Sequence, residues 1–436
     1  MIKKIIHNYS EDSLINFGQL SFYLGILCLT SLLPISIIFL LLALSISLFK
    51  NRKNFINDKW NLALLIIYIL MIISSLNAFS ISSILETPNK INITINALRW
   101  LILFLSFSSF QIYLKTTQQR IIFARVFAIS SVPLLISCAL QYWFKIYGPF
   151  NFLNGLIIWY NKPLVGIDQG VAGLFSNQNY TGFWLSILWP FSAYFFLKSN
   201  KFNFTKISSI FFLIATIFFV FMTTSRSAIL GVLVSLPIIF SLKIFIKILF
   251  ILFFIYLLII LLPIDIFSTN SLIPSKTLKI ISSKFIDINI NNFNNIIRIR
   301  IWKNSLNLIS RRPILGFGAG IFPILYLTMN EEYMAQHSHN IVLQIAFEYG
   351  TPIAILLTTF ALLLIYKSWM KIFYNSKKSS FQINLIDKCW YASTFVALIS
   401  QINDVTYFEG KISIIIWILL AGIKCIIDDS SNKLAR

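Results

Sequence analysis

Charged residues are scarce in this chain of 436 residues: only 12% are Asp, Glu, Lys or Arg, and only 15 residues are acidic. Soluble enzymes carry about twice that charged fraction, so an ordinary soluble enzyme is excluded. In place of charge, 57% of the residues are hydrophobic. The composition therefore predicts an all-α, polytopic integral membrane protein.

Cysteine is also rare. Cys28, Cys138, Cys389 and Cys425 lie inside apolar stretches and form no closely spaced pair. This pattern argues against a disulfide framework or a cysteine metal knuckle and favours four small buried hydrophobic side chains. Residues 1–19 lack the apolar core and the small-residue cleavage site of a signal peptide, so we expect insertion to depend on the first membrane helix.

Apolar runs long enough to cross about 30 Å of hydrocarbon recur between clusters of charge and proline, and they predict about twelve transmembrane helices. The run from Phe17 to Phe49 is too long for one span and contains Pro34, so we expect a hairpin of two helices there. The other predicted spans are residues 60–79, 92–114, 121–147, 179–197, 206–223, 226–242, 245–263, 340–366, 388–407 and 411–427.

The formal charge of +21 comes from short basic clusters between the apolar runs, not from one basic domain. This distribution argues against a nucleic acid partner. Clusters at 50–59, 115–120, 198–206, 243–247 and 367–388 all fall on one side of the predicted membrane. By the positive-inside rule we expect that side to be cytoplasmic and to hold both termini.

The predicted spans divide the chain into four parts. N-terminal transmembrane helices occupy residues 1–169, and central ones occupy 170–263. Residues 264–339 form a large outer loop before the tenth helix, and residues 340–436 hold the last spans and a cytoplasmic tail. Shorter outer loops lie near 80–91 and 148–178. The large loop is basic, which short outer loops usually avoid, so we expect it to serve an anionic partner.

Two sets of arginines lie at the predicted outer boundary. Arg226 stands among hydroxyl residues between two apolar runs. It is either an interfacial arginine that reaches lipid head groups or a guanidinium clamp for phosphate. Arg298 and Arg300 are two residues apart, so on a helix they cannot face the same way. At most one of them is expected to point toward a shared site.

Two of the three histidines, His337 and His339, lie just before an apolar run. Asn340 follows them, so this segment is either an ordinary helix cap or the position of a neutral-pH proton carrier. Asp404, near Glu409, is either a carboxylate that orients such a group or a solvated loop residue. The glycine-rich segment 313–320 lacks the Lys-Ser/Thr ending of a phosphate loop, so a tight turn is the better interpretation.

Several short motifs follow one another in the second half of the chain. They are Gly173-Leu174-Phe175-Ser176-Asn177-Gln178-Asn179, Ser225-Arg226-Ser227, Arg298 four residues before Trp302, Arg312-Pro313-Ile314-Leu315-Gly316-Phe317-Gly318, and His339-Asn340 with Gln344, Glu348 and Gly350. Their order, their spacing and the long outer loop before His339 resemble the O-antigen ligase family, which shares its core with the O-antigen polymerases. The resemblance covers roughly residues 170–427.

The resemblance implies a GT-C-like glycosyltransferase of the bacterial inner membrane, with its site at the periplasmic face under the large loop. The donor would be a glycan on undecaprenyl diphosphate, and the acceptor a lipid A-core or another lipid or glycolipid. Neither a nucleotide sugar nor a metal or other cofactor would be needed. The family's essential catalytic residues correspond to His339, Arg226 and Arg298. Arg300 is offset from the usual position, and we expect substrate-binding roles for Arg300, Asn340, Asn179 and Asp404.

The chemistry of glycan transfer agrees with these residue types. Fixed guanidinium groups stabilise a diphosphate leaving group, and a base of near-neutral pKa accepts the proton of the attacking hydroxyl. His339 is the candidate base, held by Asn340 or Glu348, and the transfer would invert the anomeric centre. Two alternatives stay open: a polymerase that joins repeat units on the same carrier, and a transporter of a small anion such as bicarbonate.

Overall fold

The computed structural model describes residues 13–51, 55, 57–84, 90–164, 170–199, 203–240, 242–261, 297–329, 334–374 and 381–429. Within these ranges the chain is a bundle of helices with one short antiparallel hairpin. The predicted all-α, polytopic membrane fold is confirmed.

The helices of the first half are α2 (Ser13–Cys28), α3 (Leu33–Asn51), α4 (Lys59–Ile84), α5 (Lys90–Ser109), η1 (Phe110–Tyr113), α6 (Thr117–Ser130) and α7 (Val132–Trp143). The hairpin strands β1 (Phe150–Phe152) and β2 (Ile157–Trp159) follow. Next come α8 (Gln178–Lys198), α9 (Phe204–Met222), α10 (Arg226–Ile239), α11 (Leu242–Leu261), α13 (Ile297–Arg311) and α14 (Phe322–Leu327). The last helices are α15 (Ile341–Tyr349), α16 (Thr351–Trp369), η4 (Met370–Tyr374), α17 (Phe381–Ser400), η5 (Thr406–Phe408) and α18 (Gly410–Asp428).

Every predicted span coincides with a helix, and the long first run is divided as expected, with α3 beginning beside Pro34. Two predicted spans are interrupted: Ser131 separates α6 from α7, and Gly350 separates α15 from α16. In both cases a proline follows within two residues, where its fixed φ starts the new helix. The predicted span 388–407 also ends early, since α17 stops at Ser400. Seven described segments are long and apolar enough to cross a membrane, so the total of about twelve spans remains a prediction.

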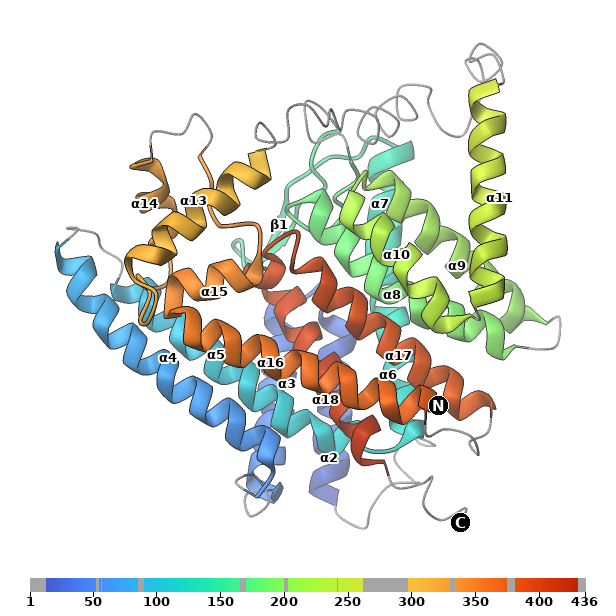
Figure 1. Cartoon of the computed structure of the whole chain (residues 1–436). Coiled ribbons are helices and arrows are strands. Elements are labelled where there is room, and N and C mark those ends of the chain that lie inside the picture. The colour runs from blue at the N-terminus through green and yellow to red at the C-terminus, as the bar shows by residue number, and fades with distance from the viewer. Residues whose placement is uncertain are drawn as a thin grey trace.

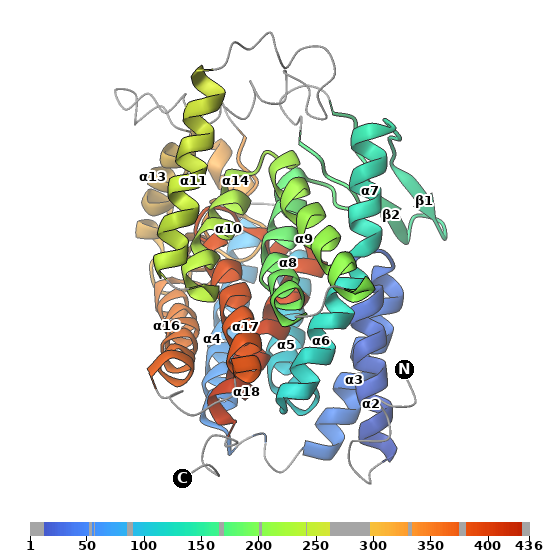
Figure 2. The same cartoon turned by 90° about the vertical axis from the view of Figure 1, so that its right-hand side faces the viewer.

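Helix α18 runs through the centre of the bundle and is buried along nearly its whole length. Helices α5, α16 and α17 pack around it, and α8 packs between α17 and α9. Figures 1 and 2 show the remaining helices around this core, with α13 and α14 lying beyond α15 at one end. We call that end, which holds residues 337–340 and 401–409, the site end.

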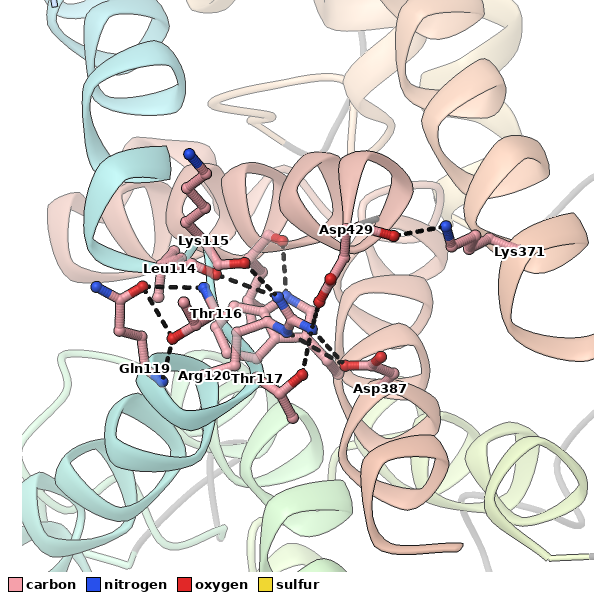
Figure 3. Close-up of polar contacts among 11 residues, drawn as sticks. Leu114, Lys115, Thr116, Thr117, Gln119, Arg120, Lys371, Asp387 and Asp429 are labelled. Carbon is pink, nitrogen blue, oxygen red and sulfur yellow. Dashed lines mark hydrogen bonds and ion pairs between the residues drawn. The ribbon is translucent and has the colours of Figure 1, made fainter. Parts of the chain in front are cut away.

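A buried ion cluster fixes the opposite end of the bundle (Figure 3). Arg120 has no exposed surface and forms ion pairs of 3.1 Å with Asp387 and with Asp429. It also donates hydrogen bonds to the carbonyl oxygens of Leu114 and Lys115. Because Arg120 lies on α6, Asp387 on α17 and Asp429 at the C-cap of α18, the cluster ties three helices together far from the site end.

The predicted large loop is described only in part. Residues 262–296 lie outside the described residues, whereas the next segment forms a helix, α13, from Ile297 to Arg311. One side of α13 buries Ile301, Leu308 and Ile309, and the other side is exposed. The helix therefore lies against the bundle through a single apolar face.

Candidate active site

The segment 337–340 is held in an unusual conformation just before α15. Asn340 is the N-cap of that helix, and its side-chain oxygen accepts hydrogen bonds from the N–H groups of Val342 (2.9 Å) and Leu343 (3.2 Å). His339 has φ of +52°, a left-handed conformation that non-glycine residues seldom adopt. Helix α15 begins at Ile341, directly after this cap.

The imidazole ring of His339 contacts the carboxylate of Asp404. Its Nδ1 lies 3.1 Å from Asp404 Oδ1, and the side chains are only 22% and 10% exposed. Asp404 is therefore a buried partner of His339, not a solvated loop residue. The two loops are also joined directly, because the N–H of Ile341 donates to the carbonyl of Gln401 at 2.9 Å. The early end of α17 at Ser400 makes this possible, since Asp404 lies in a loop.

The electrostatic setting favours a negative Asp404 beside a neutral His337. Burial alone would raise the pKa of Asp404, but the hydrogen bond with His339 and electrostatic interactions with His339, His337 and Arg298 lower it below its ordinary value. The ring of His337 lies 4.2 Å from that of His339. Burial, with added repulsion from His339 and Arg298, lowers the pKa of His337 to about 4. His337 is thus uncharged near neutral pH.

A chain of buried hydrogen bonds leads from this segment to Glu348. The N–H of Ser338 donates to Gln344 Oε1 (2.9 Å), and Gln344 Nε2 donates to Glu348 Oε1 (2.8 Å). On its other side Glu348 Oε2 accepts from the hydroxyl of Tyr407 at 2.9 Å. Arg99, from α5, donates to the carbonyl of Tyr407 and lies over its ring. Glu348 therefore connects the histidine segment to the loop that carries Asp404, while Asp404 itself contacts His339.

The glycine-rich segment packs against the same helix. The N–H of Gly318 donates to the carbonyl of Glu348 (2.9 Å), and that of Phe317 donates to Phe347 (2.8 Å). A Cβ at Gly316, where φ is +65°, would lie 2.6 Å from the carbonyl oxygen of Phe347. The interpretation as a tight turn with close backbone approach is thus the better one.

Arg226 begins α10 next to the start of α8. The preceding turn contains Thr224 with φ of +53°, an unusual value for a β-branched residue. Thr224 donates to Gln178 Oε1 at 3.5 Å. Gly182 allows close contact of the two helices, because a Cβ there would lie 2.9 Å from the Cβ of Ser225. The structure therefore brings the motif 173–179, including the half-buried Asn179, beside the exposed Arg226.

Helix packing places Arg226 at the site end. Helices α10 and α17 pack against each other, and Gly231, near the start of α10, approaches Val396, near the end of α17, so closely that a Cβ would lie 2.8 Å from Val396 Cγ1. The first turn of α10 is therefore next to the last turn of α17, which leads to Asp404. Tyr180, in the first turn of α8, lies within electrostatic range of Asp404 as well.

Arg298 and Arg300 separate as predicted from their spacing. Arg298, in the first turn of α13, is close enough to act on both His337 and Asp404. Arg300 is half-buried and lies about 200° further around the helix. Sequence reasoning missed Tyr407 and Gln401, because their contacts join segments that are distant in sequence.

His337, His339 and Asp404 could together hold a metal ion, since their ligand atoms lie within 4.8 Å of one another. Two imidazoles and one carboxylate suit zinc. The positive charge of Arg298 acts on the same site and would repel a cation. The hydrogen bond between His339 and Asp404 also occupies two of the ligand atoms.

Comparison with known protein families gives one match, to part of the chain. The family model described as O-antigen ligase matches residues 210–374, which include α10, α13, the glycine-rich turn and the histidine segment. No curated protein matches the chain. The match supports a membrane glycosyltransferase of the ligase or polymerase type.

Proposed function

We propose that this membrane protein, whose residues 210–374 match the O-antigen ligase family model, transfers a finished glycan from undecaprenyl diphosphate to a lipid A-core or another surface acceptor. The reaction takes place at the periplasmic face of the bacterial inner membrane, and both termini are cytoplasmic. In this proposal the site end is the periplasmic end.

The hydrogen bond between His339 and Asp404 is the observation that carries the proposal. A neutral imidazole with its proton on Nδ1 donates to Asp404, which leaves Nε2 free to accept a proton. The buried carboxylate then stabilises the imidazolium that forms. Such a pair is the arrangement expected of a general base, which contributes roughly 10² to 10⁴ to a rate.

The proposed step is a single displacement. The acceptor hydroxyl attacks the anomeric carbon, its proton passes to His339 Nε2, and the bond from that carbon to the diphosphate oxygen breaks with inversion. The bond electrons leave with the diphosphate. Arg226 and Arg298 are proposed to bind its oxygens, because a guanidinium presents two parallel donors to a phosphate. Asn179 and Arg300 are proposed to contact substrate at the edges of the site.

Asn340 has a narrower role in this proposal than in the sequence-based expectation. Its side-chain oxygen is used by the helix cap, so only its NH₂ group is available to bind substrate. Glu348 acts as a positioning residue, since it reaches the histidine segment only through Gln344.

A polymerase that joins repeat units on the same carrier would use the same residues, and it is the second candidate. Deleting the gene distinguishes the two: unattached long chains on a gel of surface glycans indicate a lost ligase, and single repeats indicate a lost polymerase. A small-anion transporter would instead take up labelled bicarbonate in liposomes, and His339→Ala would abolish that uptake.

Complementing the deletion with variants tests the assigned residues. His339→Ala, Arg226→Ala and Arg298→Ala should each abolish glycan attachment while the protein stays in the membrane at normal abundance. Lys303→Ala is the matched control, because Lys303 is an exposed base on the same helix as Arg298. Full attachment in all three site variants would refute the mechanism.

A further inference from the structure

The β1–β2 hairpin exposes apolar side chains at its tip. Phe152, Leu153 and Leu156 are 44%, 65% and 69% exposed, and Phe144, just before the hairpin, is 69% exposed. The turn contains the Asn154-Gly155 pair that is common in tight hairpins. Leu153 beside this pair also holds a positive φ, +51°, which is unusual for a bulky residue. An exposed leucine kept in that conformation indicates a surface with a partner.

The hairpin lies at the level where two membrane helices end. The indole N–H of Trp159 donates to the carbonyl of Ser31, in the short turn between α2 and α3, at 2.9 Å. Figure 2 shows the hairpin at the edge of the bundle, beside α7 and near the ends of α2 and α3. Directly after that turn, Ile37 and Ile38 on α3 are 39% and 66% exposed. The exposed apolar surface of the hairpin thus continues the lipid-facing surface of a membrane span.

The charge pattern of the segment matches a membrane boundary. Residues 146–161 contain no Asp, Glu, Lys or Arg, whereas exposed Lys145 and Lys162 stand on either side of them. Flanking lysines can keep their ammonium groups among lipid phosphates while the apolar part between them enters the acyl region. Aromatic residues such as Trp143 and Tyr147 are also typical of this boundary.

We propose that the tip of the hairpin is immersed in the lipid leaflet at the site end and anchors that part of the protein to the membrane surface. The occupant of the apolar tip is therefore lipid, not a second copy of the chain or a soluble partner. This proposal does not depend on glycosyl transfer.

The anchor is linked to the candidate site. At the base of the hairpin, the N–H of Asn161 donates to the carbonyl of Gly173 at 2.8 Å. Gln141 Oε1 accepts from the N–H groups of Ala172 (3.0 Å) and Gly173 (2.8 Å). The lipid contact is thus joined to the motif 173–179 beside Arg226, where a lipid-borne substrate would approach.

Fluorescence quenching tests the position of the tip. The full-length Leu153→Cys variant is labelled with an environment-sensitive fluorophore and reconstituted in vesicles of phosphatidylethanolamine and phosphatidylglycerol. The unsubstituted chain gives the background, since Cys138, Cys389 and Cys425 are buried and Cys28 is half-buried. Ile38→Cys serves as a lipid-exposed reference, and Gln118→Cys, exposed in the first turn of α6, as a water-exposed reference.

The expected result is quenching by lipid-borne spin labels at a depth of about 5 to 10 Å below the head groups, with little quenching by aqueous iodide. The emission maximum should shift from that of Gln118→Cys toward that of Ile38→Cys. Iodide quenching equal to that of Gln118→Cys would overturn the proposal. Protection from both quenchers, with cross-linking between copies through Leu153→Cys, would also overturn it in favour of a protein partner.

Discussion

Replacing Asp404 with asparagine removes the charge that faces His339 while keeping the size of the side chain. His339 Nδ1 and Asp404 Oδ1 are 3.1 Å apart. At an effective dielectric constant of about 20, a pair of unit charges at that distance attracts by about 5 kcal/mol. Partial exposure of both side chains and the opposing charge of Arg298 reduce this value, to about half. A loss of about 2.5 kcal/mol in the transition state corresponds to a rate about 10²-fold lower.

The assay is the initial rate of glycan transfer in proteoliposomes with saturating lipid-linked donor. We expect kcat to fall and KM to change little, because the imidazolium exists only once the proton has moved. Asp58→Asn is the matched control: Asp58 pairs with Lys424 at 3.0 Å at the opposite end of the bundle. A rate within threefold of the parent for Asp404→Asn, with Asp58→Asn unchanged, would refute the role of the carboxylate.

Three further predictions follow from the same contacts. The pKa of His337 is lowered from 6.5 to about 4, so between these pH values the unfolded chain binds a proton that the folded chain does not. The free energy of unfolding therefore decreases as the pH falls from 6.5 to about 4. His337→Gln should remove up to about 3 kcal/mol of this decrease, measured as a flatter dependence of Tm on pH. Arg298→Ala, which should abolish glycan attachment in cells, should lower the initial rate of transfer in proteoliposomes at least about tenfold, because a charged hydrogen bond is lost; Lys303→Ala should leave this rate unchanged. Arg120→Met should cost about 3 kcal/mol in unfolding free energy, because it takes the guanidinium away from the half-buried carboxylates of Asp387 and Asp429. Adding Asp387→Asn and Asp429→Asn should recover part of the lost Tm.

The helices could be predicted because lipid requires long apolar runs, and every expected span contains a helix. Breaks within the runs were harder to predict. Gly350 and Pro352 carry a break signal, but the apolar run continues across them, and length alone favours one helix. The hairpin had its own signal in Asn154-Gly155 between apolar residues. Its strands have only three residues each, so they resemble an ordinary loop in hydropathy.

The candidate site was predictable in its residue types and not in its contacts. The spacing predicts that Arg298 and Arg300 lie on different faces of the helix, since residues two positions apart on a helix cannot face the same way. No local pattern links His339 to Asp404, which lies 65 positions later. That pairing depends on where α17 ends and on the backbone hydrogen bond between Ile341 and Gln401. Both are consequences of tertiary packing, so the sequence left the role of Asp404 open.

The contacts also explain why arginine suits this site better than a metal ion. A metal held by His337, His339 and Asp404 would take the lone pairs that proton transfer and imidazolium stabilisation require. Arg298, on α13, acts on His337 and Asp404 by its charge alone and does not occupy their acceptor atoms. A guanidinium can therefore neutralise a departing diphosphate while His339 stays free to accept a proton. Under the proposed function, adding zinc should therefore lower the initial rate of transfer in proteoliposomes, because the histidine–carboxylate pair would handle the proton and the arginines the phosphate.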